Sequence, residues 1–79
     1  MKWYTLAAEQ GDATAQSNLG AIYYNGKGVI QDDVYAHMWF NLAASNGNKY
    51  ATKNQDIAAN RMPPADIFKA QDLVREGPW

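Results

Sequence analysis

Apolar residues recur along the chain at the three- and four-residue spacing that places side chains on one face of a helix. The clearest stripe is Ala15, Leu19, Ile22 and Tyr23, which occupy positions i, i+4, i+7 and i+8. Glycine, asparagine or proline interrupts the pattern between one stripe and the next. The pattern therefore predicts an all-α chain of about five short helices joined by tight turns.

Local start and stop signals limit these helices. The first covers about residues 3–10 and stops at Gly11, since glycine suits the left-handed position just past a helix end. Asp12 is expected to cap the second helix, which residues 25–28 interrupt. Either Asp32 or Asp33 is expected to cap the third. The fourth extends from about residue 51 toward 61, and the fifth from about 64 to 76, with proline in its first turn.

The third helix differs from the others because apolar residues cover well over a third of its circumference. Such a wide apolar face predicts packing on two sides. Its apolar positions are Tyr35, Ala36, Trp39, Phe40, Leu42 and Ala43. Its polar edge is expected to consist of His37, Asn41 and Ser45.

The segment that begins at Trp3 reappears at Trp39, a displacement of 36 residues. Unrelated segments would match at about one position in fifteen, whereas residues 3–24 aligned on residues 39–60 share seven identities. A period in this range marks units that must stack to bury their apolar faces, and such stacks usually form binding surfaces rather than reaction centres. The identical pairs are Trp3/Trp39, Leu6/Leu42, Ala7/Ala43, Ala8/Ala44, Gly11/Gly47, Ala15/Ala51 and Asn18/Asn54.

The repeat resembles the Sel-one-like repeat family, a relative of the tetratricopeptide repeat with two antiparallel helices in each unit. The resemblance implies an α/α solenoid. It also implies that residues 1–11 are the second helix of a truncated preceding unit, that residues 12–47 form a complete unit, and that residues 48–79 are divergent capping helices similar to those of bacterial members. The matching residues are Ala15, Leu19, Gly20, Tyr23, Gly26, Gly28, Val29, Asp32, Ala36, Trp39, Ala43, Ala44, Gly47 and Ala51.

Composition narrows the classes of function. The formal charge of −1 and the scattered basic residues predict no nucleic-acid binding. No apolar run approaches the roughly eighteen residues that span a bilayer, so no membrane insertion is expected. Without cysteine the chain has neither a disulfide nor a thiolate. A cytoplasmic and a periplasmic location both remain open.

No residue pattern indicates catalysis, so we expect no enzyme, no metal site and no cofactor. His37 is the only histidine, and we interpret it as a surface residue because catalytic or ligand roles need converging partners. Asp32 and Asp33 indicate a helix start rather than a cation site. Residues 25–28 indicate a turn rather than a phosphate loop. Cysteine-rich members of the family have been linked to β-lactam binding and hydrolysis, which leaves one unfavoured enzymatic alternative.

Most aromatic residues lie on apolar stripes and are expected in the core, Trp3, Tyr23 and Trp39 among them. Tyr24 instead lies opposite the Leu19 stripe, together with Thr14, Ser17 and Ala21, where an aromatic ring has no core to fill. It is therefore expected to face solvent and to anchor a partner. Asn18 and Asn54 recur at one period, and Asn25 lies at the same rim. These amides either bind the backbone of a peptide or brace neighbouring turns. The predicted partner-binding residues are Tyr24, Asn18, Ser17 and Asn25.

Two functions are compatible with this pattern. The leading hypothesis is a non-catalytic protein-protein interaction module, an adaptor or scaffold that holds a peptide or partner helix on its inner face. The alternative is a self-associating unit, because Trp3, Leu6 and Ala7 lie on a first helix that no preceding helix covers. Copies of the chain would then form a homodimer through this uncapped helix.

Overall fold

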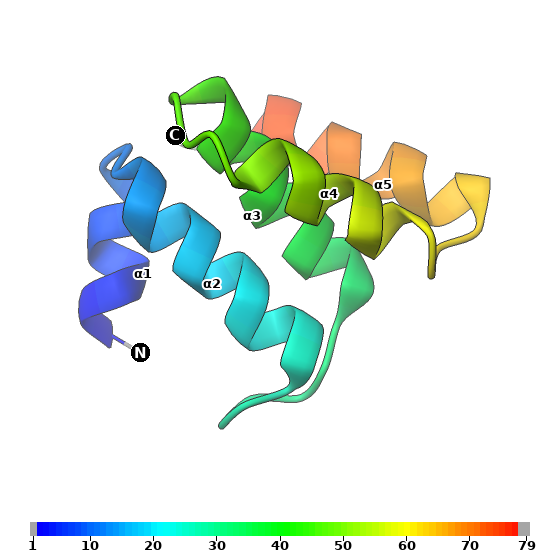
Figure 1. Ribbon diagram of the computed structural model, residues 1–79, viewed down its shortest axis with the longest axis horizontal. Coiled ribbons are helices and arrows are strands. Elements are labelled where there is room, and N and C mark those ends of the chain that lie inside the picture. The colour runs from blue at the N-terminus through cyan, green and yellow to red at the C-terminus, as the bar shows by residue number, and fades with distance from the viewer. Residues whose placement is uncertain (1, 78–79) are drawn as a thin grey trace.

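The computed structural model describes residues 2–77, which form five helices and no strand (Figure 1). This confirms the predicted all-α architecture, an α/α solenoid of short antiparallel helices. The helices are α1 (Lys2–Glu9), α2 (Ala13–Asn25), α3 (Asp33–Ser45), α4 (Ala51–Ala59) and α5 (Pro64–Glu76).

Helix α3 is the central element. It contacts α2, α4 and α5, while α1 packs against α2. Figure 1 shows α2 and α4 on either side of α3, with α1 at one end of the row and α5 at the other. The broad apolar face of α3 explains this arrangement, because a helix with apolar residues on several sides must be covered on several sides.

Side-chain caps begin two of the helices as the sequence predicts. The Asp12 carboxylate accepts a 3.0 Å hydrogen bond from the backbone N–H of Ala15, at the start of α2. The Asp32 carboxylate accepts a 3.0 Å bond from the backbone N–H of Tyr35, so Asp32 rather than Asp33 is the N-cap of α3. Gly11 has φ +94° after α1, the left-handed conformation expected of it.

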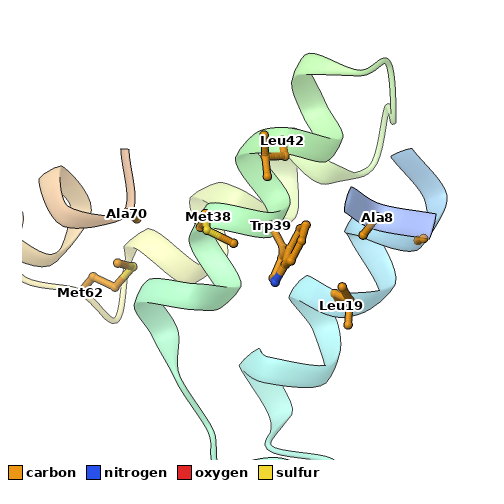
Figure 2. Close-up of a cluster of buried hydrophobic side chains, with 8 residues drawn as sticks. Ala8, Leu19, Met38, Trp39, Leu42, Met62 and Ala70 are labelled. Atoms are coloured by element: carbon orange, nitrogen blue, oxygen red, sulfur yellow. The ribbon is translucent and has the colours of Figure 1, made fainter. Parts of the chain in front are cut away.

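The main core is built around the side chain of Trp39, which is 1% exposed. In Figure 2 the ring extends from α3 toward Leu19 and Ala8, so it fills the space between three helices. Tyr35 adds an edge-to-face contact, its ring centroid 5.8 Å from that of Trp39. Met38 points from α3 in another direction, toward the α5 side of the core.

A second, smaller core lies on the side of α2 that the sequence pattern predicts to be free of core contacts. Phe40 and Ala58 form it together with Ala36, and Tyr24 and Ala21 pack partly buried against it. The expectation that Tyr24 has no core to contact is therefore wrong. Helix α3 approaches α2 closely here: a Cβ atom added to Gly20 would lie 2.5 Å from the Phe40 ring, so glycine permits this packing.

A buried amide joins three helix ends. Gln16 is fully buried, and its side-chain N–H donates a 2.9 Å hydrogen bond to the carbonyl of Ala8. Its amide oxygen accepts a 3.0 Å bond from the side chain of Asn46. The amide nitrogen and the amide oxygen of Gln16 therefore each have a hydrogen-bond partner, as burial requires. The arrangement connects the end of α1, the start of α2 and the end of α3.

His37 is buried, contrary to the prediction that it lies on a polar edge. Its side chain is 2% exposed, and its Nδ1 atom has no hydrogen-bond partner. Helices α4 and α5 both pack on α3 and cover a side that a single-helix wheel leaves open. Burial lowers the pKa of His37, because the charged imidazolium loses its hydration, and the Asp56 carboxylate opposes this shift only in part.

This burial predicts a pH-dependent stability. Because the pKa of His37 is lower in the folded than in the unfolded chain, the unfolded chain binds more protons near pH 6. The free energy of unfolding should therefore fall as the pH drops below about 6.5, with a slope of at most about 1.4 kcal/mol per pH unit. Urea denaturation at pH 7.5 and pH 5.5 measures the difference.

The matched variant is His37→Leu, which places an apolar side chain of similar size, without a titratable group, at this buried position. It should flatten the pH dependence between 5.5 and 7.5, because carboxylates titrate mostly below this window. An unchanged pH dependence in His37→Leu would show that another group is responsible.

Candidate functional site

A groove lies between α2 and α4, above the central helix α3. We call it the α2–α4 groove, and its volume is about 230 Å³. Phe40 of α3 and Ala21 of α2 contribute apolar surface, while Ile57 of α4 contributes a partly exposed aliphatic side chain. The remaining lining residues are polar or amphipathic. They are Tyr24, Asn25 and Asn54.

The groove brings together some of the predicted binding residues. Tyr24 and Asn25 both line it, as does Asn54, which occupies the position of Asn18 in the next copy of the repeat. Ser17 lies one helical turn before Ala21 but is not a lining residue, and Asn18 is exposed outside the lining. The predicted binding residues that line the groove, Tyr24 and Asn25, therefore belong to one wall, the one formed by α2.

Sequence reasoning missed the apolar floor and the opposite wall. Phe40 was assigned to the helix core, and it is indeed 3% exposed, yet its ring also forms part of the groove. The sequence pattern assigns no role to Ile57, whose side chain is 41% exposed in the wall formed by α4. The only available signal was the position of Ile57 one turn after Lys53 and one turn before Arg61, which gives that side of α4 a mixed character.

The prediction that Tyr24 faces open solvent is wrong. The guanidinium carbon of Arg61 lies 3.6 Å from the centroid of the Tyr24 ring, a cation–π contact. Arg61 Nη2 also donates a 2.9 Å hydrogen bond to the backbone carbonyl of Tyr24. One face of the ring is thus covered, and Tyr24 is half-buried.

Arg61 is held in turn by Asp33. Arg61 Nε donates a 3.1 Å hydrogen bond to Asp33 Oδ1, and Nη2 forms an ion pair with the same oxygen. The side-chain amide of Gln31 donates a 2.6 Å bond to that oxygen as well. We call Tyr24, Arg61 and Asp33 the clasp. It fastens the chain after α4 to the end of α2 and the start of α3.

The asparagines have different environments. Asn25 donates a 3.0 Å side-chain hydrogen bond to the carbonyl of Ala21, which is the local bracing role. This bond uses one of its two amide N–H donors. Asn54 is half-buried in the groove wall, while Asn18 is exposed.

The residues that could carry chemistry are occupied or isolated. Asp32 caps α3 and Asp33 is bonded to Arg61, while His37 is buried in the core. Residues 2–77 contain no group of three or more His, Asp or Glu side chains that could hold a metal ion. None of the helices in this part of the chain is long and apolar enough to cross a membrane.

The outer face of α1 is a second candidate surface. The side chain of Trp3 is 81% exposed and that of Leu6 is 44% exposed, so the prediction that Trp3 packs in the core is wrong. The equivalent residues of the second repeat copy, Trp39 and Leu42 in α3, are 1% and 6% exposed. Ala7, the third residue predicted here, is partly buried against the main core.

Comparison with known proteins assigns the class of this fold. A model of the Sel1 repeat family matches residues 1–12 and 13–48, more than half of the chain. The chain therefore belongs to the Sel1 repeat family. Sel1 repeats are generally protein-protein interaction modules and are typically non-catalytic.

One relative is a sel1-like repeat-containing protein of Acanthamoeba polyphaga mimivirus. It is 42% identical over 45 residues, which cover 57% of this chain and 8% of the viral protein. The chain thus spans a small part of the length of the curated relative that it matches.

The clasp predicts a measurable contribution to stability. Arg61→Ala removes a cation–π contact and a partly exposed ion pair, which together contribute about 1 kcal/mol. Arg75→Ala is the matched control, because the ion pair that Arg75 forms within residues 2–77 is with Asp72 on the same exposed helix surface, and it contributes about 0.3 kcal/mol. Urea denaturation measures both. Equal losses in the two variants would contradict a special role for the clasp.

Proposed function

We propose that this protein is a non-catalytic interaction module that holds a peptide segment of a protein partner in the α2–α4 groove. The observation that carries the proposal is the groove itself, which combines an apolar floor with an aromatic wall and amide groups. Binding sites commonly have this composition, because apolar surface supplies affinity and a few polar groups fix orientation.

The size of the groove favours a peptide over a partner helix. Its volume is about 230 Å³, whereas a helix with its side chains is about 10–12 Å in diameter. The hollow thus suits one or two side chains from a segment that crosses the surface. Asn25 and Asn54 stand at its edges, where amide groups can pair with the backbone of such a segment.

The four predicted residues have different parts in this proposal. Tyr24 supplies the aromatic wall, and Asn25 supplies a polar group beside it. Ser17 extends the same side of α2 by one turn beyond Ala21, so it would contact a longer segment. Asn18 would contact the partner only outside the groove.

The division into repeat units places the groove at a boundary. In this proposal residues 12–47 form one complete unit, residues 1–11 are the second helix of the unit before it, and residues 48–79 are capping helices. The groove then lies between the first helix of the complete unit and the first helix of the cap. Its two walls are α2 and α4.

Peptide selection tests the groove. A phage-displayed peptide library selected on the natural protein should yield binding peptides. Ile57→Asp should weaken their binding at least about tenfold, equivalent to about 1.4 kcal/mol, because a charge replaces apolar contact. Fluorescence anisotropy measures the affinity, and circular dichroism checks that the variant is folded.

Phe68→Ser is the matched control. Phe68 is an exposed apolar residue of α5 and does not line the groove, so its loss should leave peptide affinity unchanged. Failure to enrich any peptide, or equal affinity in Ile57→Asp, contradicts the proposed function.

A second function is favoured by the outer face of α1. We propose that two copies of the chain associate through Trp3 and Leu6, which are far more exposed than the equivalent residues of the second repeat copy, Trp39 and Leu42. In the second repeat copy, Trp39 packs against helices that present leucine and alanine. Helix α1 itself presents Leu6 beside Trp3, so the same patch on a second copy offers similar apolar chemistry.

Concentration dependence tests this association. Sedimentation equilibrium from micromolar to millimolar concentration should show a monomer–dimer equilibrium. Trp3→Ser should shift it to monomer, because that substitution removes the largest apolar surface at the contact. Phe68→Ser again serves as control and should leave the equilibrium unchanged. A natural chain that stays monomeric throughout this range defeats the idea.

A further inference from the structure

The two walls of the α2–α4 groove differ in charge. Helix α2 contains no Asp, Glu, Lys, Arg or His along its whole length. The opposite wall is formed by α4, where Lys53 precedes the lining residue Ile57 by four residues. Side chains four residues apart lie on the same side of a helix. Lys53, which is exposed, therefore stands beside the pocket.

The cationic character continues at the start of this wall. Tyr50 precedes the lining residue Asn54 by one helical turn, and the backbone N–H of Asn54 donates to its carbonyl. The Tyr50 ring is 67% exposed, and the Lys49 ammonium lies 5.4 Å from its centroid. Two lysines and an exposed aromatic ring thus stand at one end of the groove.

Neither of these lysines is held by a carboxylate in the described part of the chain. Among residues 2–77 the ion pairs are Arg61–Asp33 and Arg75–Asp72, so neither Lys49 nor Lys53 takes part in one. Asp33 is occupied by Arg61 in the clasp. Asp56, the only acidic residue of α4, is exposed and lies three residues after Lys53, but the two side chains form no ion pair, and the Asp56 carboxylate also acts on the buried His37. Lys49 and Lys53 together still give this end a net positive charge.

From this arrangement we infer that the peptide bound by the groove is acidic, with an apolar side chain in the pocket and a carboxylate two residues away that pairs with Lys53. This inference rests on the proposed function. It adds the chemical class of the partner. An end of the groove with net positive charge would disfavour basic segments and favour acidic ones.

The spacing follows from helix and strand geometry. Lys53 and Ile57 are four residues apart, which corresponds to about 6 Å along the axis of α4. An extended peptide rises about 3.3 Å per residue, and residues i and i+2 lie on the same face. A carboxylate two residues from the anchoring side chain therefore reaches Lys53. The recognised pattern is apolar–any–acidic, read in either chain direction.

Two synthetic probes test the inference. One is fluorescein-labelled Ser-Glu-Ser-Leu-Ser-Glu-Ser, and the other has glutamine in place of both glutamates. Anisotropy titrations with the natural protein at low salt should give an affinity for the acidic peptide that is about two- to fivefold higher, the size of one exposed ion pair. Lys53→Glu should abolish this preference and leave the affinity for the glutamine peptide unchanged.

Lys69→Glu is the matched control, because it makes the same charge change on α5, away from the groove. It should preserve the preference for the acidic peptide. A preference lost equally in Lys53→Glu and Lys69→Glu would reflect net charge alone and would overturn the inference.

The remaining outcomes separate this inference from the proposed function. Equal binding of both peptides, with loss of both in Ile57→Asp, overturns the acidic preference and leaves the groove as a peptide site. Binding of neither peptide overturns the inferred pattern, and the library selection then decides independently whether the groove binds peptides at all. If Ile57→Asp does not weaken binding of the acidic peptide, the peptide binds outside the groove. This outcome also overturns the inference.

Discussion

Helix α3 is buried on most of its circumference, and every other feature of the molecule depends on how its sides are covered. Trp39 requires α1 and α2 on one side, and Met38 requires the α5 side of the core on another. Phe40 lies between these, so its ring both fills the smaller core and forms part of the groove. The position of the groove thus follows from the packing of one helix. Two neighbours of α3, namely α2 and α4, contact it without packing closely on each other.

The sequence predicted what depends on local chemistry. The helix limits follow from capping side chains and left-handed glycines, and these act within three or four residues of each other. The hydrogen bond of Asp12 to Ala15 is an example. The repeat was equally visible, because identities at a fixed period need no knowledge of three-dimensional structure. For such features a residue's neighbours in the chain are its neighbours in space.

The sequence failed where distant segments meet. His37 was misplaced because a helix wheel shows one helix alone and cannot tell which sides later helices cover. The clasp joins Tyr24 to Arg61 across 37 residues, and no periodicity reveals such a pair. Gln16 was missed for the same reason, since its partners lie on two other segments. The candidate site was accordingly half predicted: the α2 wall was recognised, whereas the floor and the α4 wall come from tertiary packing.

The clasp also has a consequence for the thermodynamics of recognition. An exposed aromatic side chain normally loses rotational freedom when a partner arrives, and this loss subtracts from the affinity. The Tyr24 ring is already stacked on Arg61, whose guanidinium is fixed by Asp33. Its orientation is therefore set when the chain folds. A partner bound as proposed would meet a rigid wall in the free protein, so most of its contact energy with that ring would remain available for binding.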